Sequence, residues 1–266
     1  FIFSHHFHGN NAKYDVLFSA MAKLGFVLVA PNHADAVFEG SKAKPEDAPE
    51  VAWATPELWA PETFKARCND IRAVLRGLDY DAELSGRIDF SRVILGGHSL
   101  GGYTALSMAG AQDGWKIEGV RGVIAISPYT NPLGQWEALA KLNVPVLYLT
   151  AKDDFLRASI VGEAYSQTPE PRYLVDFTSG DHFLWSGSGT PEQNAATIHY
   201  ATAFADAYLG LGSTTLLQVK MPSVERVWWK DLGGQSEEGL REAENEFLKA
   251  ARDAIKEKNL KKAAGE

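Results

Sequence analysis

The chain has 266 residues, of which 45% are hydrophobic and 23% charged, and its formal net charge is −8. This length is enough for one α/β domain with a large core. The negative charge and the lack of a basic stripe outside the far C-terminus argue against a nucleic-acid surface. No apolar run approaches the ~18 residues that a membrane-spanning helix needs. The single cysteine, Cys68, excludes a disulfide within the chain.

Short apolar runs that alternate with helical patterns dominate residues 1–212. The predicted strands cover residues 1–4, 26–30, 93–95, 122–127, 144–150 and 172–177. The predicted helices cover residues 14–24, 61–78, 103–109 and 198–209. This alternation predicts an α/β fold with a doubly wound, mostly parallel sheet. Because the chain starts at Phe1 inside a predicted strand, we expect a removed leader or a fragment, and exported and cytoplasmic locations both stay open.

Two segments depart from this alternation. Residues 34–61 carry four prolines, mixed charges, Trp53 and Trp59. A loop of this length is usually functional or disordered, and the tryptophans favour a segment folded over the mouth of a site. Residues 213–266 form a predicted C-terminal extension: 214–220 and 224–229 as a small two-stranded piece, and 236–261 as a charged amphipathic helix. That helix docks either on the core or on a second copy of the chain, and both alternatives stay open.

The pentapeptide Gly97-His98-Ser99-Leu100-Gly101 lies between a predicted strand and a predicted helix. A serine in so sharp a turn takes a strained backbone, and its neighbours two positions away must be small. The turn lifts the Ser99 hydroxyl above the sheet and leaves the Leu100 N–H at a helix start. The alternative is a glycine-rich turn with an incidental serine. A phosphate loop fits worse, because no Lys-Ser or Lys-Thr follows the glycines. Ser99 is therefore the candidate nucleophile.

A serine hydroxyl needs a base that takes its proton, and that base needs an orienting carboxylate. Parallel sheets place their sites at the carboxyl ends of strands, so we searched the loops that follow them. Asp153 and Asp154 follow the strand at 144–150, and His182 follows the strand at 172–177. The order Ser99, Asp154, His182 is the order of nucleophile, acid and base in this type of turn. Asp154 is favoured over Asp153.

The first loop, after residues 1–4, offers a second donor for an oxyanion, the Phe7 N–H. It also holds His5, His6 and His8, which together with His33 suggest a metal site. Side chains on a tight loop seldom converge, however, and no cysteine or acidic cluster joins them, so no metal is expected.

Several motifs in order resemble the α/β-hydrolase superfamily over roughly residues 1–210. They lie at residues 3–10, 29–33, 97–103, 127–129, 154–155 and 180–183. Within the superfamily the chain is most similar to dienelactone-hydrolase-like serine esterases, with platelet-activating-factor acetylhydrolases, chlorophyllases and cutinase-type polyesterases as kin. The resemblance implies a Ser99–Asp154–His182 triad, an oxyanion hole from the N–H groups of Phe7 and Leu100, and no cofactor. It also implies that Tyr129 lines the acyl pocket, with ordinary core packing as the alternative.

Three departures from the family pattern are visible. Dienelactone hydrolases proper have cysteine where this chain has Ser99, so lactone chemistry is not implied. His6 and His8 replace the usual glycines of the first loop. The family's first two strands are absent before Phe1. Apart from these three departures, residues 213–266 have no recognised counterpart in the family.

The predicted function is a serine carboxylic-ester hydrolase that acts through an acyl-enzyme. The aromatic residues near the expected site favour a small, apolar or aromatic ester; they are Trp53, Trp59, Tyr129 and Trp185. The alternatives are a polyester hydrolase, an acyltransferase or a peptidase on the same triad, and a catalytically dead binding module. The expected partners are a small-molecule or polymeric ester and, through the C-terminal helix, a second copy.

Overall fold

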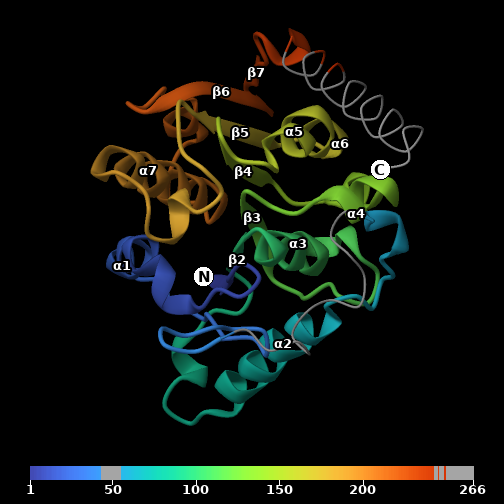
Figure 1. Ribbon diagram of the computed structural model, residues 1–266. Helices are drawn as coiled ribbons and strands as arrows, with labels where there is room; N and C mark the ends of the chain where they lie inside the picture. Colours follow the sequence, from blue (N-terminus) through green and yellow to red (C-terminus); the bar gives the residue numbers. More distant parts are fainter. Residues whose placement is uncertain (43–54, 243–244, 246–248, 250–266) are drawn as a thin grey trace, which may run out of the picture.

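The computed structural model describes residues 1–42, 55–242, 245 and 249. Its centre is a seven-stranded sheet in the order β1-β2-β3-β4-β5-β6-β7 (Figure 1). The parallel strands are β1 (Ile2–Ser4), β2 (Val93–His98), β3 (Val120–Ile126), β4 (Val146–Ala151) and β5 (Arg172–Phe177). The antiparallel strands β6 (Val224–Asp231) and β7 (Gly234–Ser236) extend the same sheet beyond β5.

Helices cover both faces of this sheet. On one face α1 (Asp15–Lys23) packs beside α7 (Pro191–Tyr208). The other face carries α2 (Lys65–Tyr80) and α3 (Leu100–Leu106), with the short helices α4 (Asn131–Gln135), α5 (Arg157–Ser159) and α6 (Tyr165–Gln167). Short helical turns lie at Asn11–Tyr14, Pro56–Leu58, Ser85–Arg87, Ser107–Ala111, Ala138–Lys141, Ile160–Ala164, Leu184–Ser186 and Thr214–Gln218. The predicted doubly wound, mostly parallel α/β sheet is confirmed. No helix among the described residues is long and apolar enough to cross a bilayer.

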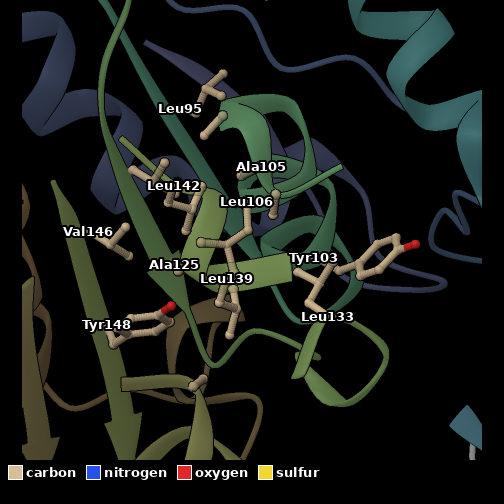
Figure 2. Packing of buried hydrophobic residues seen from close by; sticks show 14 of the residues in the cluster. Leu95, Tyr103, Ala105, Leu106, Ala125, Leu133, Leu139, Leu142, Val146 and Tyr148 are labelled. Carbon is tan, nitrogen blue, oxygen red and sulfur yellow. The ribbon is translucent and has the colours of Figure 1, made fainter. Parts of the chain in front are cut away.

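The strands are apolar on both faces because each face meets a helical layer. Along β4 the side chains alternate: Val146 and Tyr148 join the core under α3, whereas Leu147 and Leu149 join the core under α1 and α7. Figure 2 shows part of the core under α3, where residues of β2, β3 and β4 meet α3 and the chain around Leu139 and Leu142. Burial of each large aliphatic side chain contributes about 1.5–3 kcal/mol.

The chain changes direction between β1 and β2. From β1 it crosses to residues 26–30 on the outer side of β1, and from β2 onward it moves the other way across the sheet. The carboxyl ends of β1 and β2 therefore flank a topological switch point, where open parallel sheets place their sites.

Several predicted elements differ in the structure. The helix predicted at residues 198–209 begins already at Pro191, and the strand predicted at 93–95 continues to His98. Residues 26–30 were expected as a buried strand, but only Val29 forms a bridge, to Ile2, and Val27 is exposed at the sheet edge. Residues 214–220 form a short 3-10 turn instead of a strand, because their N-terminus is capped by Ser213 and Leu217 packs under α7. Helix α2 begins at Lys65 instead of Pro61, because Phe64 takes a left-handed conformation with φ 61°.

The described part of the C-terminal region joins the core sheet. β6 pairs with β5 along the whole of Arg172–Phe177, and its Trp228 is buried in the core. A helical turn begins at Leu240, and most of the helix predicted at residues 236–261 lies outside the described residues.

Candidate active site

Ser99 lies in a strained turn between β2 and α3. Its φ is 57° and its ψ is −117°, a conformation that L-residues rarely adopt. The turn is closed by contacts that only glycine allows: a Cβ on Gly97 would overlap the Gly101 carbonyl, and a Cβ on Gly101 would overlap the Ser4 carbonyl. The Ser99 carbonyl accepts hydrogen bonds from Tyr103 N–H (3.1 Å) and Tyr129 N–H (3.0 Å). The side chain of Ser99 is partly exposed at the carboxyl edge of the sheet.

Asp154 and His182 form a buried pair at the same edge. His182 Nδ1 lies 3.1 Å from Asp154 Oδ1, and since a carboxylate only accepts, the imidazole donates. Asp154 Oδ1 also accepts the Leu156 N–H at 2.9 Å. Asp153 is exposed and turns away, towards the Gly180 N–H. Of the two candidate carboxylates, the structure brings only Asp154 to His182.

The Ser99 hydroxyl and the His182 imidazole share no hydrogen bond within the described part of the chain. The ring of His98, next to Ser99, lies 4.8 Å from the His182 ring, so the two segments are close neighbours. Hydrogen bonds of this kind are often long without substrate and tighten only in the complex.

One residue of this cluster was missed by the sequence analysis as a site residue. The fully buried Ser127 hydroxyl, at the end of β3, donates to Asp154 Oδ2 and lies 3.2 Å from His182 Nδ1. Its signals in the sequence are its place in the motif at residues 127–129 and its position directly after a strand that neighbours the strand of Ser99.

The buried side chain of Arg67 binds the backbone of the first loop. Arg67 of α2 donates through Nη1 to the His5 carbonyl (2.6 Å) and to Ser4 Oγ (3.2 Å), and through Nη2 to Asp35 (2.5 Å). Asp35 in turn accepts the His8 N–H at 3.3 Å. Burial would raise the pKa of Asp35, but the Arg67 guanidinium outweighs it and holds that pKa below its usual value.

Ser4 connects this network to a hydrogen-bonded chain of Ser4, His33 and Asp70. His33 Nδ1 donates to Asp70 at 2.8 Å, and burial lowers the pKa of His33 although Asp70 opposes the effect. The neutral ring therefore accepts the Ser4 hydroxyl at Nε2 (2.9 Å). Ser4 is 1% exposed, so its hydroxyl supports the loop and meets no substrate.

Tyr14 links the first loop to the residue before Ser99. Its hydroxyl accepts the His6 N–H at 3.1 Å and lies 2.9 Å from His98 Nδ1. Burial raises the pKa of Tyr14, so the phenol keeps its proton at neutral pH.

His5, His6 and His98 stay neutral at neutral pH because burial lowers their pKa values. Burial lowers the pKa of His5 to about 3, that of His98 well below its usual value, and that of His6 below its usual value. His5 Nδ1 and His6 Nδ1 each donate to a loop carbonyl. Among the described residues, no three His, Cys, Asp or Glu side chains are arranged to share a metal ion.

The loop accommodates the two histidines that stand in place of glycines. His8 takes the left-handed conformation with φ 57°, which histidine tolerates better than most residues, and its ring stacks on Phe7 at 3.8 Å. His6 places its ring near those of His98 (5.2 Å) and Phe183 (5.5 Å).

Aromatic rings line one side of the site. The Trp59 ring lies 5.1 Å from Tyr129 and 5.3 Å from Phe64, which in turn packs 5.9 Å from Phe7. Trp53 lies outside the described residues. Trp185 is buried behind His98 and against Phe177, in the core under α7.

Two exposed phenylalanines flank His182 and were also missed. Phe155 is 71% exposed with its ring 4.4 Å from that of His182, and Phe183 is 50% exposed at 5.4 Å. Each directly follows a candidate site residue, Asp154 or His182, which is the signal that could have found them.

The seven-stranded, mostly parallel sheet with helices on both faces is an alpha/beta hydrolase fold, and a comparison with known proteins supports this assignment. A family model described as the alpha/beta hydrolase fold matches residues 59–181. That stretch contains Ser99 and Asp154 and ends directly before His182. The match supports a hydrolase of this fold. A search among curated proteins gives no match.

Arg67→Met should destabilise the fold by about 3–5 kcal/mol, because it leaves the buried Asp35 carboxylate unpaired. Urea unfolding of the purified variant measures this. Lys141→Met, which removes an exposed ion pair with Asp113, is the matched control and should change stability by less than about 1 kcal/mol. Asp35→Leu in the Arg67→Met background should restore part of the loss, and an unchanged midpoint in Arg67→Met would contradict the role of this pair.

Stability should fall as the pH is lowered from about 7 towards 4. His5, His33 and His98 have pKa values below their unfolded value of about 6.5. In this pH window the unfolded chain therefore binds more protons than the folded chain. Each such imidazole adds up to about one proton to the slope of unfolding free energy against pH. Urea titrations at several pH values test this. His98→Asn, whose amide can still meet Tyr14, should flatten the slope, and stability that rises on acidification would refute the argument.

Proposed function

We propose that the protein is a serine carboxylic-ester hydrolase. The observation that carries this proposal is the buried Asp154–His182 pair on the same sheet edge as the strained, partly exposed Ser99. In this proposal Ser99 Oγ attacks the acyl carbon of an ester while His182 Nε2 takes the hydroxyl proton. Asp154 holds Nδ1–H, so that Nε2 is the free base, and stabilises the imidazolium that forms.

The oxyanion of the tetrahedral intermediate would be met by the N–H groups of Leu100 and Phe7. Leu100 is the first residue of α3, where the helix supplies no acceptor for its N–H. Phe7 belongs to the first loop, whose start lies against the serine turn, since a Cβ on Gly101 would overlap the Ser4 carbonyl. This close approach supports Phe7 as the second donor. Collapse of the intermediate expels the alcohol, which takes its proton from His182. Water then attacks the acyl carbon while His182 takes a proton from it. The second intermediate releases the carboxylic acid, and His182 returns the proton to Ser99 Oγ.

The rings around Ser99 favour an apolar or aromatic acyl or alcohol group. Tyr129 and Trp59 are both buried, and Tyr129 is fixed to the Ser99 carbonyl through its own N–H. An acyl chain that leaves Ser99 on this side would lie against aromatic surface.

Replacing Ser99 by Ala should lower kcat for p-nitrophenyl butyrate by about 10⁴- to 10⁶-fold, because the remaining groups have no nucleophile to activate. His182→Gln should lose activity to a similar extent. The matched control is Ser19→Ala on the exposed side of α1, which should keep wild-type kcat. A wild type no faster than Ser99→Ala would refute the proposal.

Two measurements on the same protein separate the rival functions. A fluorophosphonate probe should label Ser99, since labelling needs an activated hydroxyl, and the absence of labelling would favour a binding module without activity. Added alcohols or amines should leave most of the acyl-enzyme to water, and efficient capture would favour an acyltransferase.

The exposed Phe155 and Phe183 favour a second candidate substrate, a polyester surface. Two exposed rings beside His182 are apolar surface that a chain in a polymer film can cover. We expect the protein to release soluble products from a polyester film and Phe155→Ala to slow this release more than it slows hydrolysis of p-nitrophenyl acetate. Equal effects on both substrates would count against the polymer.

A further inference from the structure

Ser127 is a buried serine in a conformation that disfavours it. It directly follows β3, its φ is 38°, and its side chain is fully buried. Its N–H donates to the Leu149 carbonyl at 2.8 Å, which fixes it to β4, the strand that leads to Asp154. A left-handed residue with a side chain stores strain that the surrounding structure must offset, and such residues gather at functional sites.

The hydroxyl of Ser127 touches both members of the acid–base pair. It donates to Asp154 Oδ2, and its oxygen lies 3.2 Å from His182 Nδ1. The His182 Nδ1–H therefore lies between two acceptors, Asp154 Oδ1 at 3.1 Å and Ser127 Oγ. The hydroxyl can fill both roles because one O–H donates while its lone pairs accept.

The hydrogen bonds of Asp154 explain why this hydroxyl matters. The carboxylate side chain has 0% exposure, so water does not complete its bonds. Oδ1 accepts from His182 and from the Leu156 N–H. Within the described residues, the donor that the structure gives to Oδ2 is the Ser127 hydroxyl. A buried carboxylate oxygen without a donor is costly, and the group then turns or rearranges to find one.

We propose that Ser127 is a positioning residue for ester hydrolysis that acts through Asp154, an inference that rests on the function proposed above. The hydroxyl fixes the rotation of the carboxylate, so that Oδ1 faces His182 Nδ1. It also gives Nδ1–H a second acceptor beside Asp154 Oδ1. Together these contacts hold the imidazole in the tautomer whose Nε2 is the base for Ser99. Ser127 itself contacts no reacting atom.

The test compares Ser127→Ala and Ser127→Gly with wild type in p-nitrophenyl butyrate hydrolysis. Each should lower kcat by roughly 10- to 100-fold with KM within about twofold of wild type, because the lost contact acts on the base and not on substrate binding. Glycine suits a φ of 38°, so Ser127→Gly should fold even if the alanine variant is unstable. Ser107→Ala is the matched control: Ser107 is also fully buried, and its hydroxyl meets only the Gln112 amide among the partners described.

A double-mutant cycle separates positioning from a purely structural role. In an Asp154→Ala background, Ser127→Ala should cause less than a twofold further loss of kcat, because the group through which it acts is gone. The same loss in both backgrounds, wild-type kcat in both Ser127 variants, or failure of both to fold would each overturn the inference while leaving the Ser99-dependent activity in place. Wild-type activity that survives Ser99→Ala would instead overturn the proposed function and this inference together.

Discussion

The close approach of three backbone segments at Ser99 is the constraint on which the rest of the site depends. The end of β2 turns so sharply into α3 that Gly97 meets the carbonyl of Gly101, and Gly101 meets the carbonyl of Ser4 at the end of β1. Because no side chain fits in these contacts, the serine turn and the first loop are fixed to each other as one rigid unit. The Ser99 hydroxyl and the two candidate oxyanion donors, from Leu100 and Phe7, are thereby placed on elements that cannot shift independently.

The buried polar residues under this unit all have hydrogen-bond partners: Arg67, Asp35, His33, Ser127 and Asp154 are buried, and Asp70 is partly exposed. Arg67 pairs with Asp35, His33 with Asp70, and Ser127 with Asp154. In each pair, hydrogen bonds within the protein replace hydrogen bonds to water. Arg67 also binds the His5 carbonyl of the first loop, and the other two pairs orient the rings of His33 and His182. The neutral state of the buried histidines follows from the same burial, and it keeps positive charge away from the base that the proposed chemistry needs.

The surroundings of the site divide into a buried and an exposed aromatic part. Trp59 packs against both Tyr129 and Phe64, and the Tyr129 N–H donates to the Ser99 carbonyl. Phe155 and Phe183 instead lie exposed beside His182. The buried part is continuous with the core below α3 and so has a fixed shape. The exposed part can contact a large apolar surface without a change in the fold. A small aromatic ester and a polymer chain would use these two parts to different extents.

The sequence by itself determined the alternation of strands and helices, the strained serine turn and the strand ends that carry Asp154 and His182, because these depend on local apolar patterns and on glycine spacing. It did not determine the strand character of residues 26–30 or 214–220, since pairing at a sheet edge and capping decide those segments. The sequence favoured Asp154 over Asp153, and the tertiary structure brings only Asp154 into contact with His182, because adjacent residues in a turn point in different directions. Arg67 carries no motif. Ser127, Phe155 and Phe183 lie within motifs noted above, but the contacts of all four residues arise only where distant elements pack together.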